Sequence, residues 1–450
     1  MIQDMTQGNP TRLLLTFAVP ILLGNLAQQL YSTAGAVIVG KGVSVDALAA
    51  IGVTTSMNFM ILGFAIGLTH GFSILVSQRF GAHNDQGVKK AVCMSVLLSF
   101  ATSIFITILS LHVSMPLLRL LNTPENIIQD ANLYIQVLFG ATTASIFLNL
   151  FSAFLRALGD SRTPLVALVL STIVNILFTL LFVLVFRWGV AGAALGTVTA
   201  QVFTCIYCFL AMRRIPQFQL TKEDWQPERK TLLELLKLGL PVGLMNSVTA
   251  IGLMILQSVV NGFGSAYVAA FTAGGRIVGL SQQPGQAFGL AMATYTGQNL
   301  GAGRIDRIKS GVRKCIMLST LFNAAVAAVL LLFPKQLTLL MVDASEAEVI
   351  GITQQYLTVC ALFLGVLGLL FIYRCALQGL GNTLVPMVSG GLELLLRVAA
   401  STLLPPLIGF YGIGFSEVSA WTGAGLLLMI AYYMSIRRME RSRASQNEFV

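Results

Sequence analysis

Charge is scarce in this chain. Charged residues make up only 10% of its 450 residues, whereas hydrophobic residues make up 56%. A soluble protein of this length needs far less apolar sequence to build one or two cores. Apolar runs of roughly 20 residues recur from end to end, and a run of that length crosses a bilayer as a helix. They are too long and too continuously apolar for the strands of a membrane barrel. The composition therefore predicts an all-α integral membrane protein.

Residue groups that carry chemistry are also missing. There is no phosphate-binding glycine loop, so we expect no ATP site. His70, His83 and His112 are far apart, and they make neither a metal-binding spacing nor a nucleophile–base pair. Cys205 and Cys208 have the spacing of a redox or zinc pair, but they lie within an apolar run and have no second pair. We therefore expect no metal, no cofactor and no enzymatic activity.

Twelve transmembrane helices are expected, six in each half of the chain. Their approximate ranges are 13–39, 48–75, 91–112, 132–155, 164–187, 190–212, 232–258, 267–293, 312–333, 351–378, 386–408 and 413–436. Residues 1–212 should form an N-terminal lobe and residues 238–450 a C-terminal lobe with a short basic tail. The segment 213–237 between them holds Pro216 and Pro227 and is expected to be a linker.

Basic residues are distributed unevenly between the loops. If the N-terminus is cytoplasmic, 21 of the 28 Lys and Arg residues fall on the inner side. This bias predicts that both termini and the linker are cytoplasmic. The net charge of +10 is thus explained by topology. No basic cluster is interleaved with aromatic residues, so nucleic-acid binding is not expected. The first residues lack a basic segment ahead of the apolar run, and we expect no cleaved signal peptide.

The sequence contains an internal duplication. Short stretches of the first half return about 220 residues later, in the same order. The matched pairs are Gln78–Ala82 with Gln298–Ala302, Leu155–Asp160 with Leu377–Asn382, and Pro20 with Pro241. Many transporters are built from such repeats, with the substrate site between them. Because each half has an even number of spans, the repeats should share one orientation and be related by a pseudo-two-fold axis along the membrane normal.

Five stretches carry a family resemblance across residues 10–437. They are Ala47–Gly52, Ser77–Ala82, Leu155–Asp160 with Pro164, Gln298–Gly303, and Ala376–Thr383 with Pro386. In this order, the chain resembles the multidrug and toxic compound extrusion (MATE) family, in its bacterial DinF-like branch. The resemblance implies secondary active efflux of small organic molecules by proton- or sodium-coupled antiport, with alternating access of two six-helix lobes. It also implies a monomer in the lipid bilayer of a bacterial inner membrane.

The sequence departs from that family where ions are expected to bind. Similar members carry an acidic residue in the first span, at the position of Gly35. They carry another in the fifth span, four residues after Asn175, where this chain has Thr179. The acidic residue that some branches carry in the seventh span is absent too. The ion-coupling residues of the family therefore cannot be carried over to this chain.

The C-terminal half offers substitutes. Glu393 and Glu417 lie within its spans, together with Arg276, Arg374 and Arg397. A charge at bilayer depth costs about 2.5–3.5 kcal/mol, so it is usually functional or paired. Glu393 and Arg397 are four residues apart, the favoured spacing for a same-helix pair. Either they form a permanent pair, or Glu393 takes up a proton or cation, or exchanges Arg397 for a cationic substrate. Because an arginine partner favours the charged carboxylate, coupling requires the pair to break.

The other charged residues within the spans are expected at the following places. Arg374, near the inner end of its span, is expected to extend to the membrane surface. Glu417 is expected near the outer interface. Arg276 has no acidic residue one turn away and is expected to line a cavity.

Polar and flexible side chains within the spans are candidates for the wall of a substrate cavity. Unpaired amides facing lipid are costly, and the thioether of methionine suits varied ligands, although it also fills gaps between helices. The candidates are Gln28, Asn58, Asn175, Gln257, Arg276, Gln282, Gln286, Met57, Met254 and Met292. Three arginines against two acids within the spans leave anionic, zwitterionic and neutral cargo open.

Three other functions remain open at this point. A flippase for a lipid-linked precursor would need more basic residues in the cavity. A membrane-embedded transferase would need clustered carboxylates or a His–Asp pair at one membrane face, and the sequence shows neither. A non-transporting regulator would agree with the missing acids of the first half.

Overall fold

A computed structural model describes residues 2–121 and 123–448, and among these residues there is no β-strand. The first repeat contains α1 (Pro10–Gly42), α2 (Val45–Gly81), α3 (Asp85–Leu120), α4 (Glu125–Gly140), α5 (Thr142–Ala157), α6 (Arg162–Leu180), the π-helical turn η1 (Leu181–Val185) and α7 (Gly189–Met212). Two short 3₁₀ turns follow, η2 (Pro216–Phe218) and η3 (Lys222–Trp225).

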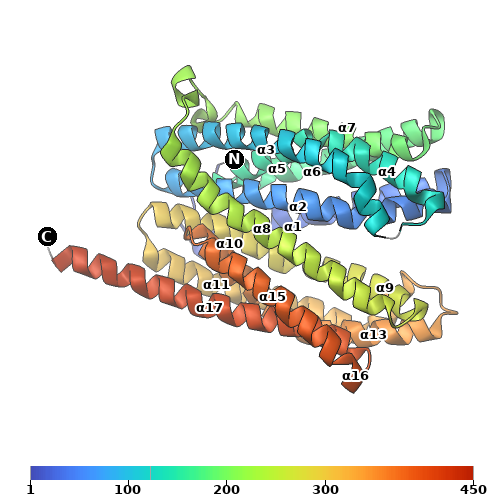
Figure 1. Ribbon diagram of the computed structural model, residues 1–450. Helices are drawn as coiled ribbons and strands as arrows, with labels where there is room; N and C mark the ends of the chain where they lie inside the picture. Colours follow the sequence, from blue (N-terminus) through green and yellow to red (C-terminus); the bar gives the residue numbers. More distant parts are fainter. Residues whose placement is uncertain (1, 122, 449–450) are drawn as a thin grey trace. The chain divides into compact units, whose positions relative to one another are not determined.

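The second repeat follows along the chain, from yellow-green to red in Figure 1. It contains α8 (Arg229–Asn261), α9 (Ser265–Ser281), α10 (Gln283–Gly301), α11 (Ile305–Leu332), α12 (Pro334–Leu339), α13 (Ala347–Leu362), α14 (Leu364–Gly379), α15 (Leu384–Leu403), α16 (Pro405–Ile408) and α17 (Tyr411–Glu448).

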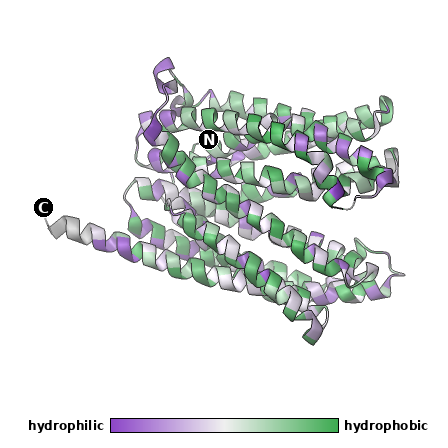
Figure 2. Cartoon of the chain, viewed as in Figure 1, coloured by the Kyte–Doolittle hydropathy of each residue, from purple (hydrophilic) through white to green (hydrophobic). Residues whose placement is uncertain are grey.

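Most helices have the length and composition of membrane spans. Among the described residues, nine single helices are long and apolar enough to cross a bilayer, or up to eleven spans if each of two bent pairs counts as one. Hydrophobic residues run along the helices, and many hydrophilic residues gather near helix ends (Figure 2). The expected eighth span, 267–293, is divided into α9 and α10 at Gln282, two residues before Pro284.

The two bent pairs occupy matching positions of the repeats. Helices α4 and α5 meet at 50°, and so do α13 and α14. The expected spans 132–155 and 351–378 are therefore each broken near the middle. Neither break contains a proline, so the sequence offers no obvious signal for it.

The repeated glycine motifs form matching turns. Gly159 and Gly381 have φ of 88° and 81°, in the region that L-residues other than glycine rarely adopt. The side chain of the next residue then accepts hydrogen bonds from the first turn of the following helix, which begins two residues later. Asp160 Oδ1 accepts hydrogen bonds from the Arg162 and Thr163 N–H groups, and Asn382 Oδ1 accepts one from the Val385 N–H group. These two glycines therefore serve the turns that reverse the chain between spans.

The linker between the repeats is ordered by a local cap. Thr221 and Asp224 form a reciprocal capping box around η3. The Thr221 N–H donates to the Asp224 carboxylate and lowers the pKa of that group. Helix α8 starts at Arg229, so its first turns lie within the predicted linker 213–237.

The described helices pack into two compact units that do not follow chain order. Unit 1 holds Leu23–Ser247 with the short segment before Met5, and unit 2 holds Met5–Leu22 with the chain from Val248 onward. Helices α1 and α8 each pass from one unit to the other along their length. The lobe boundaries drawn from the sequence stay a prediction.

Each unit has its own apolar core. In unit 1 the largest core surrounds Phe72, Phe154 and Leu235, so it includes the start of α8. In unit 2 it surrounds Tyr295 and Leu377 and includes Phe17 of α1. The first half of each crossing helix is thus buried in a core built mainly by the other repeat.

Candidate functional site

Four charged side chains lie buried side by side in unit 2. Arg374 comes from α14, Glu393 and Arg397 from α15, and Glu417 from α17. Their exposed fractions are 7%, 3%, 3% and 6%. Helix α15 is amphipathic, and its buried face carries Pro386, Ser389, Gly390, Glu393, Arg397 and Ser401 at helical spacing. The stripe that packs inward on α15 is therefore small and polar as well as charged.

The charges form two ion pairs between helices. A terminal nitrogen of Arg374 donates a short hydrogen bond to Glu393 Oε1. Arg397 Nη2 donates to Glu417 Oε2 at 3.0 Å. Because Glu393 and Arg397 are one helical turn apart, the four side chains make an alternating row with no net charge. We call Arg374, Glu393, Arg397 and Glu417 the charge row.

The charge row is not fully satisfied by hydrogen bonds. Within the described chain, Arg397 Nε and Nη1 and Arg374 Nε are buried and have no acceptor. An unmet buried donor costs about 1–3 kcal/mol. Gly252 of α8 makes room for Arg397, because a Cβ at that position would lie 2.8 Å from Arg397 Nη1. The arginines therefore have free hydrogen-bonding capacity next to their acidic partners.

Two sequence-based expectations about these residues were wrong. Arg374 does not extend to the membrane surface but is buried against Glu393, and Glu417 is buried against Arg397 instead of lying at an interface. A permanent pair of Glu393 with Arg397 is one of the two alternatives that the sequence leaves open; in the structure Glu393 pairs with Arg374 of α14 and Arg397 with Glu417 of α17. The physical reason is that the neighbouring helices bring opposite charges close enough to compete with the same-helix partner.

The cavity candidates of unit 2 divide into exposed and buried groups. Arg276 and Gln286 are exposed, and Gln282, Gln257 and Met254 are half-buried. Gln257 Nε2 donates to Asn261 Oδ1 at 2.9 Å. Met292 is fully buried in the apolar core, where it fills space. Polar exposed groups within spans need water or a partner, so Arg276 and Gln286 mark a polar face of unit 2.

The candidates of unit 1 divide in the same way. Gln28 is exposed and Asn58 is half-buried, with its Oδ1 lacking a partner among the described residues. Met57 is packed in a small apolar core. Asn175 is buried, and its Nδ2 lies 3.5 Å from Thr197 Oγ1 on α7.

The positions where the resemblance implies acids are neutral in unit 1. Thr179 is buried one turn after Asn175, and its Oγ1 has no partner within the described residues. A Cβ at Gly35 would meet no atom within 4 Å, so the missing side chain leaves open space there. Among the described residues, no group of three or more His, Cys, Asp or Glu could hold a metal ion.

Duplicated membrane helices, a buried charge row and polar faces within spans define a class of protein, the two-repeat membrane transporter. The model of the MatE family matches the chain twice, over residues 20–181 and 241–403. The chain therefore belongs to the MatE family, and each repeat carries one copy of its conserved region.

Relatives and solved structures cover nearly the whole chain. It is 30% identical over 414 residues to the probable multidrug resistance protein YpnP of Bacillus subtilis (strain 168), covering 91% of this chain and 92% of that protein. It is 26% identical over 383 residues to the probable multidrug resistance protein NorM of Thermotoga maritima, covering 83% and 81%. An outward-facing multidrug resistance MATE family transporter of the MOP superfamily superposes with a TM-score of 0.91 at 25% identity, covering 97% of this chain and 98% of that one.

These likenesses confirm the predicted class. The chain is an all-α, multi-pass membrane protein with the twelve-helix, two-lobe fold of MATE transporters, and its function is export by that kind of carrier. Its finer placement in the DinF-like branch stays a prediction.

Proposed function

We propose that this protein is an antiporter of a bacterial inner membrane that exports small organic molecules in exchange for protons or sodium ions. In this proposal it works as a monomer, without a cofactor and without enzymatic chemistry, and both termini lie in the cytoplasm. The observation that carries the proposal is the charge row, which places two carboxylates inside unit 2. The positions of unit 1 where the family resemblance implies acids are neutral, at Gly35 and Thr179.

Glu393 is the proposed ion-coupling residue and Arg374 its counter-charge. While the pair is closed, the arginine neutralises the carboxylate, so an incoming proton or cation has to compete with Arg374 for it. Uptake of a proton or cation at Glu393 must release Arg374, which leaves a buried positive charge without its partner. That charge favours a rearrangement of α14 against α15, because an unpaired buried charge is costly. Ion binding and helix movement are thereby linked.

We propose a substrate surface on each unit by itself, made of polar and flexible side chains of its spans. In unit 2 it includes Arg276, Gln282, Gln286, Gln257 and Met254, and in unit 1 it includes Gln28 and Asn58, with the buried Asn175 included from the sequence pattern only. Met57 and Met292 would contribute only after repacking, because both are buried in apolar cores. Arg276 is a single exposed cation on this surface, so we propose that anionic and zwitterionic molecules are included among the cargo.

The test is efflux into inverted vesicles with proton and sodium gradients imposed separately. Wild-type protein should accumulate substrate when one of the two gradients is present. Glu393→Gln should remove the gradient-driven part of transport, while the protein still inserts and binds substrate. Glu440→Gln is the matched control, because Glu440 pairs with Lys309 at 2.6 Å on an exposed surface. Export is compared over about one pH unit either side of neutrality. Gradient-driven export by Glu393→Gln at the wild-type rate across that range would refute the coupling role.

A further inference from the structure

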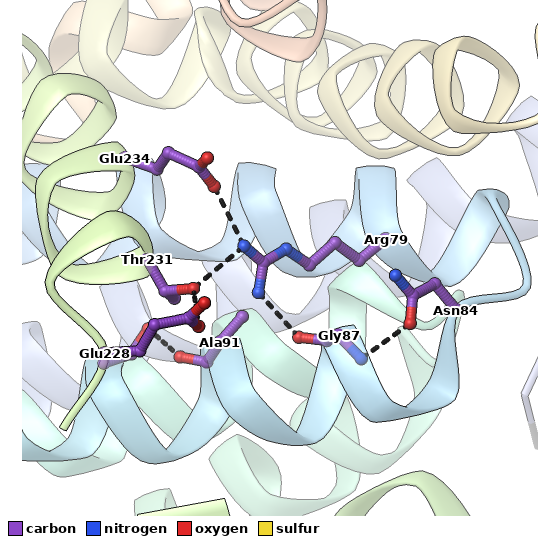
Figure 3. A network of polar contacts seen from close by, with 8 residues as sticks. Arg79, Asn84, Gly87, Ala91, Glu228, Thr231 and Glu234 are labelled. Atoms are coloured by element: carbon purple, nitrogen blue, oxygen red, sulfur yellow. Dashed lines mark hydrogen bonds and ion pairs between the residues drawn. The ribbon is translucent and has the colours of Figure 1, made fainter. Parts of the chain in front are cut away.

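The repeated Gln-x-x-Gly-Ala motifs each hold the start of a helix that belongs to the other repeat. In unit 1, Arg79 lies in the first motif at the end of α2 (Figure 3). Its Nη1 donates to the Gly87 carbonyl at 2.9 Å. Its Nη2 donates to Thr231 Oγ1 at 3.1 Å and to Glu234 Oε2 at 2.9 Å, both in the first turns of α8. Arg79 thus ties α8 to α2 and α3.

Further contacts make this attachment of α8 tight. Thr231 is buried, and its hydroxyl donates to Glu228 Oε2 at 2.6 Å. Glycines then let the two backbones approach closely, because a Cβ on Gly71 would lie 2.4 Å from the Gly239 Cα. Small residues permit such close helix contacts in membranes. We call Arg79, Thr231 and Glu234 the first anchor.

In unit 2 the second motif binds the segment that leads into α1. Met5 N–H donates to Gln298 Oε1 at 2.8 Å, and Asn299 Nδ2 donates to the Met5 carbonyl at 3.1 Å. Arg307 spans the site, with Nε on Asn299 Oδ1 at 3.0 Å, Nη1 on the Gly8 carbonyl at 3.0 Å and Nη2 on the Met5 carbonyl at 3.1 Å. Gln298, Asn299 and Met5 are fully buried. We call Gln298, Asn299 and Arg307 the second anchor.

The two anchors are arranged reciprocally, although they use different kinds of hydrogen bond. The first repeat's motif holds the start of α8, and the second repeat's motif holds the segment that leads into α1. Both helices then change units, α1 after Leu22 and α8 after Ser247. Each contains a proline ahead of that point, Pro20 and Pro241, which removes one backbone hydrogen bond from the helix. Any movement of one unit against the other must therefore be accommodated within these two helices or at the two anchors.

We propose that the anchors are positioning residues for transport that stay closed throughout the cycle. Their side chains fasten the first half of α1 and of α8 to the opposite repeat, so that the second halves are moved when the units move. The first anchor depends on a partly exposed ion pair, with side-chain exposures of 18% for Arg79 and 36% for Glu234. The second depends on hydrogen bonds to the backbone of Met5 and Gly8. This inference assumes the alternating-access export proposed above.

The experiment replaces the first anchor by a covalent link. In a background without the six native cysteines, Arg79→Cys with Glu234→Cys removes the ion pair. A flexible bis-thiol reagent then joins the two positions. Before linking, the maximal export rate should fall roughly tenfold, because a charge-assisted hydrogen bond contributes about that factor, while substrate affinity stays unchanged. After linking, export should return toward the wild-type rate, since a closed anchor is the working state.

A matched pair controls for the reagent. Lys309→Cys with Glu440→Cys removes an exposed ion pair between α11 and α17, which both belong wholly to unit 2, and neither step should change export. If linking at 79 and 234 stops export further, the anchor has to open and the proposal is wrong. If the unlinked variant exports at the wild-type rate, the anchor has no positioning role.

Exchange of the two charges tests the same anchor without a reagent. The unmodified protein distinguishes failure of the anchor proposal from failure of the proposed antiport. Arg79→Glu should lose export, and adding Glu234→Arg should restore part of it. A merely structural role would instead change expression and substrate affinity together. Absence of gradient-driven export from the unmodified protein would overturn the proposed antiport. The anchors are then tested by the same variants in transport of substrate down its own concentration gradient, where an unchanged rate in the unlinked variant would overturn their positioning role.

Discussion

At the scale of single residues, the charge row shows that the net stability contributed by a buried ion pair depends on its surroundings. Arg397 and Glu417 are nearly inaccessible, so their attraction is opposed by a large desolvation cost. Arg397 also leaves two donors unmet within the described chain. Such a pair contributes little net stability, yet removing one partner leaves a buried charge alone. Its presence in an otherwise apolar bundle is better explained by function than by stability.

Glu417→Gln should therefore destabilise the protein more than loss of the whole pair does. We expect the single substitution to lower the free energy of unfolding by about 3 kcal/mol, because Arg397 is left without its counter-charge. The double variant Arg397→Met with Glu417→Leu should recover most of that loss. Thermal unfolding in detergent, read as a double-mutant cycle, measures the difference. Equal stabilities of the two variants would show that Arg397 is not desolvated.

The ion pairs also show how much of the charge row can be predicted from the sequence. The charges within the spans could be identified because charge is rare there, and this makes Glu393 and Arg397 candidates for ion coupling. Their partners could not be identified, because the i to i+4 rule considers one helix and the observed partners come from α14 and α17. The two anchors could not be predicted for the same reason. Their motifs are recognisable as a duplication, but the segments that they bind are more than 150 residues away.

At the scale of elements, the duplication is most exact in the turns. His83 and Gly303 follow the repeated motif at matching positions, with φ of 53° and 67°. Gly159 and Gly381 match in the same way. The sequence predicted the spans and placed glycines at their ends, which these turns explain. It did not predict the 50° bends between α4 and α5 and between α13 and α14, because neither break contains a proline that would signal it.

Two of these turns should respond differently to substitution. Gly303→Asn should change stability by less than about 1 kcal/mol, because a Cβ there meets no atom within 4 Å and asparagine tolerates positive φ. Gly159→Asn should cost several times more, since its Cβ would lie 2.0 Å from the Gln3 carbonyl oxygen. Thermal unfolding of the two purified variants gives the comparison. A similar loss in both would mean that φ alone, and not the approach of residue 3, sets the cost.

At the scale of the whole molecule, the repeats are alike in fold but differ in chemistry. Each repeat matches the MatE family model once, and each has one bent pair and one anchor motif. The charge row belongs to unit 2, whereas unit 1 has Gly35 and Thr179 where acids are expected. The division of the chain also differs between levels, because the sequence repeats meet in the linker while the packed units exchange the first halves of α1 and α8. Packing of this kind is set by tertiary contacts and was not visible in composition or periodicity.

Orientation in the membrane follows from the distribution of basic residues between the loops. The loop around η3 lies after six expected spans and carries basic residues, so it should be cytoplasmic. The turn at Asp343–Ser345 lies after nine expected spans, within a segment whose one basic residue is Lys335, so it should face outward. Alkaline phosphatase fused after Trp225 should be inactive and after Ser345 active, and a fluorescent protein that folds only in the cytoplasm should give the opposite result. A fusion to the C-terminus should behave like the one at Trp225. Active phosphatase at Trp225 would reverse the topology and place the anchors, which lie at the same helix ends as the basic loops, on the outer face.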